Sequence, residues 1–217
     1  MMARRSLLLL YLLLQGCEGA RLLALPDSAS QASDGRQAIS KRLPNLNVTV
    51  EAGAWHHRPR RFTDEFLPFL VEIVNHSRLD VNLRLAEVSL VDDHGRTRRP
   101  LRPDEAVSLL LGGSDPSTLV PSIGIEATGP EPTIFNLELG FNFGRDRDLR
   151  HIRRLAFPPE PIPPGSRAEG FIYFPKPPPD ASRLTVFLTL DAPSGRHELL
   201  FSYLVQRGGL NRTGQND

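Results

Sequence analysis

Short runs in which apolar and polar residues alternate recur along this chain, and they constrain its fold more than any other feature. A period of two is typical of a β-strand with one buried face. The runs that we predict as strands are residues 46–50, 67–73, 81–90, 134–143, 167–174, 184–190 and 197–205. Turns rich in glycine and proline separate them, and the chain has 17 glycines and 20 prolines. The pattern predicts a mainly β fold, an antiparallel β-sandwich.

Some segments interrupt the alternation. The run 81–90 changes parity, which requires either a β-bulge in its middle or two short strands. Pro103, with acidic residues directly after it, predicts the start of a short helix, and Leu149 and Ile152 share one face of a second helix. Residues 114–132 form a long loop rich in glycine, proline and serine. We therefore expect one or two short helices in the loops of the sandwich.

The chain begins with a positively charged stretch that leads into an apolar one. Arg4 and Arg5 precede the apolar run 7–14. Eight residues of helix rise only about 12 Å, against the roughly 30 Å of bilayer hydrocarbon, so this run is too short for a transmembrane helix. The arrangement is that of a secretory signal peptide, which we predict at residues 1–16.

The leader ends in Leu14-Gln15-Gly16-Cys17. These residues resemble the lipobox of bacterial lipoproteins, in which Leu, a variable residue and Gly or Ala precede a Cys. The resemblance implies cleavage before Cys17, acylation of Cys17 by chains such as palmitate, and a lipid anchor at the periplasmic face of the envelope. Two or three acyl chains hold a protein on a membrane stably, whereas one holds it only marginally. In such lipoproteins an Asp directly after the acylated Cys resembles an inner-membrane retention signal. This chain has Glu18 at that position, and the absence of Asp favours the outer membrane.

In an alternative interpretation the N-terminal segment is still a secretory signal, but the mature protein carries no lipid anchor. An ordinary secretory signal cleaved a few residues further on, for example after Gly19, would remove Cys17 and release a soluble domain. Cys17 is the only cysteine of the chain, so on either reading the mature protein has no disulfide and depends on its core alone.

The strand rhythm resembles immunoglobulin-like sandwich domains appended to bacterial lipoproteins, without the Cys-Trp-Cys core of antibody domains. We accordingly expect an immunoglobulin-like β-sandwich behind a flexible spacer of mixed polar composition. The predicted organisation is a signal peptide at 1–16, a flexible tether at 17–43, the β-sandwich domain at 44–207 and a polar tail at 208–217.

Motifs of enzymes and of metal centres are missing from the sequence. It contains no Gly-x-Ser-x-Gly elbow, no phosphate-binding Gly-x-x-x-x-Gly-Lys loop and no dinucleotide fingerprint, so we expect no enzyme and no cofactor. His56-His57 is the feature most like a metal site, but adjacent residues on a strand point to opposite faces, so we expect exposed loop histidines and no metal. The formal net charge of +1 argues against a nucleic-acid binder.

Arginines gather in the second predicted helix. We predict an anion-facing patch of Arg147, Arg150, Arg153 and Arg154, which would meet phospholipid, lipopolysaccharide or the carboxylates of peptidoglycan. The alternative is a solvated helix face whose arginines pair with nearby aspartates.

Together these features predict a lipid-anchored, non-enzymatic interaction or assembly module of the cell envelope, with an unidentified envelope protein or glycan as its partner. Two alternatives remain. One is an envelope hydrolase whose dispersed acids converge at the loops 114–132 and 145–156, and the other is a secreted soluble binding domain.

Overall fold

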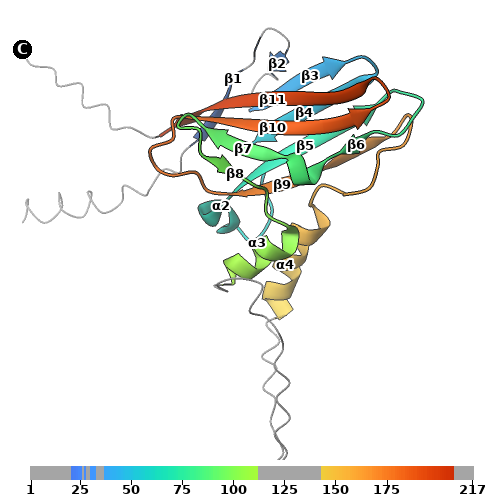
Figure 1. Ribbon diagram of the computed structural model, residues 1–217. Coiled ribbons are helices and arrows are strands. Elements are labelled where there is room, and N and C mark those ends of the chain that lie inside the picture. The colour runs from blue at the N-terminus through green and yellow to red at the C-terminus, as the bar shows by residue number, and fades with distance from the viewer. Residues whose placement is uncertain (1–20, 26, 28–29, 33–36, 112–142, 208–217) are drawn as a thin grey trace, which may run out of the picture.

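The computed structural model describes residues 21–25, 27, 30–32, 37–111 and 143–207, which form two antiparallel sheets facing each other (Figure 1). The predicted β-sandwich is confirmed, because the protein is mainly β with few short helices. One sheet has six strands and the other has five.

The order of the strands places the first and last strands side by side. The six-stranded sheet runs β1-β11-β10-β7-β8, with β6 also beside β10, and the five-stranded sheet runs β2-β3-β4-β5-β9. The strands of the first sheet are β1 (Arg21–Leu25), β6 (Asn82–Leu83), β7 (Ser89–Asp92), β8 (Thr97–Arg98), β10 (Arg183–Ala192) and β11 (Gly195–Gln206). Those of the second are β2 (Ser30–Ala32), β3 (Ala38–Leu43), β4 (Leu46–Ala52), β5 (Phe66–Asn75) and β9 (Arg167–Pro175).

The alternating residues fill the space between the sheets, as the sequence predicts. On β10 the inward positions are Leu184, Val186, Leu188 and Leu190, each at most 1% exposed. In the five-stranded sheet, Val48, Val50, Val71 and Ile73 are equally buried and belong to the same core cluster. Burying an aliphatic side chain of this size contributes about 1.5 to 3 kcal/mol, so these facing rows hold the sheets together.

Three helices gather on one side of the sandwich, below the sheets in Figure 1. They are α2 (Phe62–Glu65), α3 (Pro103–Leu110) and α4 (Phe143–Arg154). Leu149 and Ile152 of α4 are 8% and 0% exposed, which confirms the predicted apolar face of this helix. They pack in a second core cluster with Trp55, Phe62 and Tyr173, and the Tyr173 hydroxyl donates a 2.8 Å hydrogen bond to the Ile152 carbonyl oxygen.

The expected tether at 17–43 is wrong over its described part, because this part belongs to the sandwich. β1 pairs with β11 along its whole length, β2 pairs with β3, and β3 pairs with β4. The reason is that backbone pairing with a long neighbour forms these strands without a clear alternation of their own. The sandwich therefore begins at or before Arg21 and not at residue 44.

Two other expectations are resolved in detail. The parity change in 81–90 comes from two short strands, β6 and β7, separated by a 3₁₀ turn at Leu85–Glu87 and not by a bulge. The predicted strand at 134–143 lies outside the described residues except for Phe143, which begins α4.

Candidate functional site

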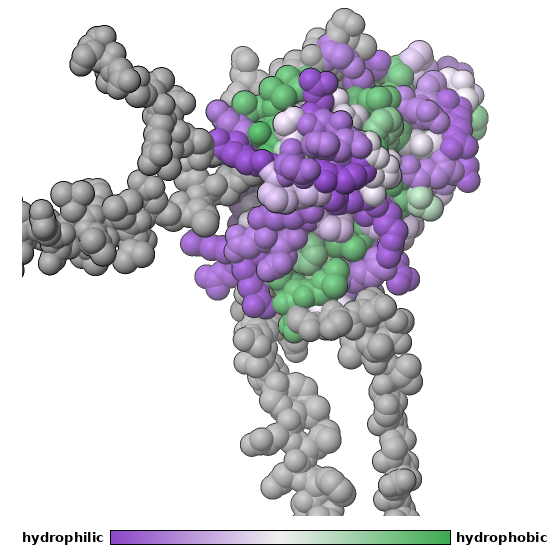
Figure 2. Space-filling view, turned by 60° about the vertical axis from the view of Figure 1, so that its left-hand side comes forward, coloured by the Kyte–Doolittle hydropathy of each residue, from purple (hydrophilic) through white to green (hydrophobic). Residues whose placement is uncertain are grey.

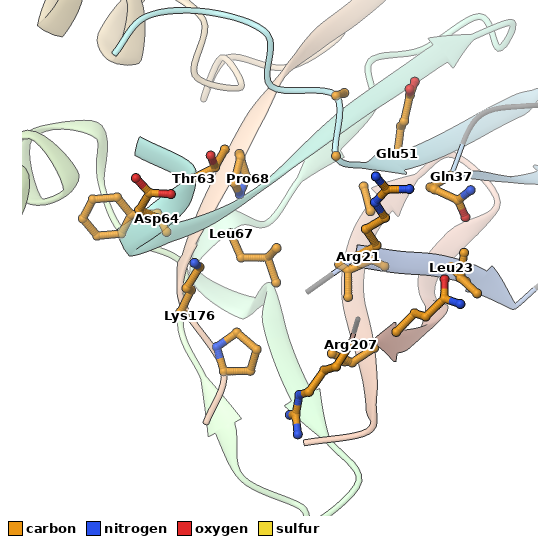
Figure 3. A pocket seen from close by; sticks show the side chains of 18 of the residues that line it. Arg21, Leu23, Gln37, Glu51, Thr63, Asp64, Leu67, Pro68, Lys176 and Arg207 are labelled. Atoms are coloured by element: carbon orange, nitrogen blue, oxygen red, sulfur yellow. The ribbon is translucent and has the colours of Figure 1, made fainter. Parts of the chain in front are cut away.

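A groove of about 1060 Å³ opens at one end of the sandwich, between the two sheets (Figure 3). Its walls come from the ends of strands in both sheets, from α2 and from the loop between β9 and β10. Its lining includes Arg21, Leu23, Leu67, Lys176, Arg207 and the prolines 177–179. A cavity of this size lies at the upper end of the range for small-molecule sites, which is about 300 to 1000 Å³.

The local sequence explains the shape of the groove. The prolines 177–179 follow Lys176 and link β9 in one sheet to β10 in the other, and a run of prolines favours a stiff, extended backbone that no ladder hydrogen bonds hold. On the opposite wall, the side-chain oxygen of Gln37 accepts a 2.8 Å hydrogen bond from the Ala24 backbone, which satisfies part of the open edge of β1. The stiff proline run on one wall and this hydrogen bond on the other therefore both contribute to the shape of the groove.

The groove is lined by half-buried leucines and by three exposed cationic side chains, which we call its cationic rim. Leu23, Leu67 and the three prolines supply apolar surface, while Arg21, Lys176 and Arg207 supply cationic groups. None of these three cations forms an ion pair with a carboxylate of the described residues, although the Arg207 guanidinium donates a 2.8 Å hydrogen bond to the Ala181 carbonyl oxygen. Glu51 and Asp64 also line the groove, so its charge is mixed with a cationic excess.

Figure 2 looks more directly at the side from which this end of the sandwich opens. The apolar surface there is divided into separate areas bordered by polar residues and does not form one continuous face. This side of the molecule therefore offers apolar and hydrophilic surface next to each other.

A cluster of aromatic rings packs against Phe66, which lines the groove and whose ring centroid lies 4.9 Å from that of Phe62. The Trp55 ring packs against Phe62, Phe171 and Tyr173, at centroid distances of 4.7, 5.0 and 6.0 Å. Trp55 is 7% exposed, whereas its neighbour His56 is exposed and lines the groove.

His56 and His57 are exposed loop histidines, as expected. The sequence did not indicate that His57 lies beside His151, with the ring centroids 6.1 Å apart. Partial burial lowers the pKa of His57, and the nearby charges of His151, His56 and Arg154 lower it further. The neutral form of His57 is therefore favoured at neutral pH.

One group of possible metal ligands occurs among the described residues: Asp92, Asp93 and His94, in the turn between β7 and β8. Their carboxylates are already used by the protein. The Arg96 Nε donates a 2.6 Å hydrogen bond to Asp92, and the Ser182 hydroxyl donates one to Asp93. Arg96 also forms two hydrogen bonds with Asp180, of 2.7 and 3.0 Å, so the group reads as a network that holds the turn.

The predicted arginine patch on α4 is only partly free. Arg150, Arg153 and Arg154 are exposed, whereas the Arg147 side chain lies outside the described residues. Arg153 forms a 2.6 Å ion pair with Asp104 of α3, and Arg150 has an interaction partner of its own. The pairing with Asp104, 49 residues away in the sequence, could not be predicted from local spacing.

Cys17, the signal peptide and the loop 114–132 lie outside the described residues, as does the polar tail. Within the part of the chain that the structure describes, no helix is long and apolar enough to cross a membrane.

Comparison with known proteins finds no matching family model, no matching curated protein and no matching solved structure.

Proposed function

We propose that this chain is a lipid-anchored, non-enzymatic interaction module on the periplasmic face of a bacterial cell envelope, at the outer membrane more than at the inner. The support from the sequence is the leader that ends in Leu14-Gln15-Gly16-Cys17. The support from the fold is a groove with apolar walls and a cationic rim, a combination suited to binding a ligand that has both apolar and anionic parts.

The observation that carries the proposal is the position of this groove relative to the cysteine. Arg21 both begins β1 and lines the groove, and it follows Cys17 by four residues. The binding surface is thus next to the predicted point of attachment. A module held at a membrane by its N-terminus would have this groove close to the lipid surface.

The experiment is cell fractionation of the full chain and of the variant Cys17→Ser. We expect Cys17→Ser to leave an uncleaved precursor and to lose the membrane association that depends on lipid. Gly16→Ala is the matched control, because the lipobox accepts either residue there, and it should be processed and anchored like the parent. Normal processing and membrane association of Cys17→Ser would contradict the proposal.

A further inference from the structure

The geometry points to a ligand for the groove: an anionic phospholipid of the same membrane in which the chain is anchored. The groove end of the sandwich would then face the membrane. The lipid headgroup would lie at the cationic rim, and part of an acyl chain would lie between the apolar walls. This inference rests on the proposed function for the anchor and goes beyond it in naming the orientation and the ligand.

The spacer between Cys17 and the sandwich is short. Only residues 18–20 separate Cys17 from Arg21. Four residue steps extend to about 14 Å at most, at roughly 3.3 to 3.6 Å per residue. β10, with 10 residues, spans about 33 Å. The spacer is therefore shorter than the sandwich, and it keeps the groove end, but not the far end, near the acylated cysteine.

Three cationic side chains line the groove. Arg21, Lys176 and Arg207 reach the same groove from β1, from the β9–β10 loop and from the end of β11 (Figure 3). None of them forms an ion pair with a carboxylate of the described residues, so their charges are available to an external anion. Glu51 and Asp64 also line the groove, which leaves a formal excess of one positive charge, three minus two. Each basic side chain near an anionic bilayer strengthens binding by about fivefold at low salt.

Apolar side chains line the groove together with these cations. Leu23, Leu67 and the prolines 177–179 present hydrocarbon surface directly beside the three cations. A free phosphate ion would use the cations but not this surface, whereas a phospholipid uses both. The volume of about 1060 Å³ has room for a headgroup and part of a chain.

The test measures which end of the sandwich meets the lipid. Cys17 is the only cysteine, and acylation consumes its thiol, so a cysteine introduced elsewhere is the single reactive thiol of the lipidated protein. Pro179→Cys lies at the groove and Pro193→Cys lies in the β10–β11 turn at the far end, and both prolines are exposed. Each full-length variant carries a fluorophore on this thiol and is placed in vesicles of phosphatidylglycerol and phosphatidylcholine that contain a lipid with a nitroxide headgroup.

We expect the nitroxide to quench the fluorophore at position 179 several-fold more than the one at position 193. Equal quenching at both positions, or stronger quenching at 193, would overturn the orientation. In vesicles of phosphatidylcholine alone, quenching at 179 should fall, and no change would show that anionic headgroups are not bound.

Charge variants test the rim separately. Arg21→Gln with Arg207→Gln should reduce the quenching at 179 toward the value at 193. Arg42→Gln with Arg78→Gln, which changes two exposed arginines away from the groove, should leave it unchanged. Persistent quenching at 179 in the first pair, with an unchanged unfolding midpoint, would contradict the role of the cations.

Failure of the anchor would be seen separately. If Cys17 keeps a free thiol, the chain without any added cysteine takes up the fluorophore. That result contradicts the proposed function, as does a mature N-terminus downstream of Cys17, which would also leave the parent chain unlabelled. A parent chain whose N-terminal peptide carries the acylated Cys17, with equal quenching at both ends, contradicts only the lipid-bound orientation.

Discussion

The hydroxyl group of Tyr203 on β11 donates a 2.8 Å hydrogen bond to the carbonyl oxygen of Val50 on β4, so one buried contact joins the two sheets. Tyr203 is 0% exposed and its ring lies 5.3 Å from that of Phe69. Burial raises the pKa of Tyr203, and the charge of Glu51 raises it further. The hydroxyl therefore stays protonated and remains a donor over the ordinary pH range.

Tyr203→Phe should lower the free energy of unfolding by about 1 to 2 kcal/mol, because it removes this buried hydrogen bond and leaves the ring in place. Urea unfolding followed by fluorescence measures the change. Tyr173→Phe is the matched variant, because the Tyr173 hydroxyl donates its hydrogen bond to Ile152 of α4 and not to the opposite sheet. We expect Tyr173→Phe to speed amide exchange in α4 and Tyr203→Phe to speed it in β4 and β11. The same exchange pattern in both variants would contradict these separate roles.

Gly170 on β9 lies where a second backbone segment passes very close. A Cβ added there would be 2.4 Å from the Phe157 Cα and 2.6 Å from its nitrogen. Hydrogen bonds of 2.7 and 2.9 Å between residues 155–157 and Phe171 hold that segment in place. Gly170→Ala should therefore destabilise the protein by about 3 kcal/mol or more, because backbone has to move.

Thermal unfolding of Gly170→Ala and Gly165→Ala separates this steric effect from backbone strain. Gly165 has φ +69° and open space around its added Cβ, so its substitution should cost only about 1 to 2 kcal/mol. A smaller loss for Gly170→Ala than for Gly165→Ala would show that residues 155–157 do not pack as described.

Carboxylates in and beside the turn between β7 and β8 should make the free energy of unfolding decrease at acidic pH. The hydrogen bond from Ser182 lowers the pKa of Asp93 to about 2. The hydrogen bond from Arg96 lowers the pKa of Asp180. An aspartate in the unfolded chain has a pKa of about 3.9. The lowered native values mean that this stabilisation is complete above about pH 4 and is lost as the pH falls toward 2.

The unfolding midpoint measured between about pH 5 and pH 2 tests this dependence. Asp93→Asn should flatten part of the fall in stability, whereas Asp80→Asn, an exposed aspartate of the β5–β6 connection, should not. Parallel curves for the parent and Asp93→Asn would show that Asp93 does not contribute.

The arginines of α4 give a different expectation from those of the groove. Two freely available arginines would weaken binding to anionic vesicles by about 30-fold at low salt when both are removed. Since Arg153 is already paired with Asp104, Arg153→Ala with Arg154→Ala should cost clearly less than Arg21→Gln with Arg207→Gln. Co-sedimentation with phosphatidylglycerol vesicles at low and high salt measures both. A larger, salt-sensitive loss for the α4 pair would favour the predicted α4 patch instead.

The sequence predicted the parts of the fold in which burial follows local periodicity. Val186 and Leu188 are buried as the alternation of β10 requires, and Ile152 is buried as the helical spacing requires. Prediction from the sequence failed where pairing with strands that are distant in the sequence determines whether a segment forms a strand. In β3, Lys41 follows the inward position of Ile39 and lies 5.8 Å above the Phe201 ring, with its ammonium 2.6 Å from Asp27. The charged Lys41 interrupts the alternation of apolar and polar residues, so the sequence pattern does not indicate this strand.

The candidate site could not be predicted for the same reason. Its cations come from Arg21, Lys176 and Arg207, which only the β1–β11 pairing and the β9–β10 connection bring to one end. The triple proline after Lys176 was the one local signal, and by itself it predicts only a rigid turn.

The mass of the mature N-terminal peptide shows whether the chain is cleaved before Cys17 and acylated there. We expect protein purified from membranes to begin at Cys17 and to carry the mass of a diacylglyceryl group and an amide-linked acyl chain. An unmodified N-terminus downstream of Cys17, or a mature chain that begins with an unmodified Cys17, would contradict the lipid anchor and favour a secreted domain.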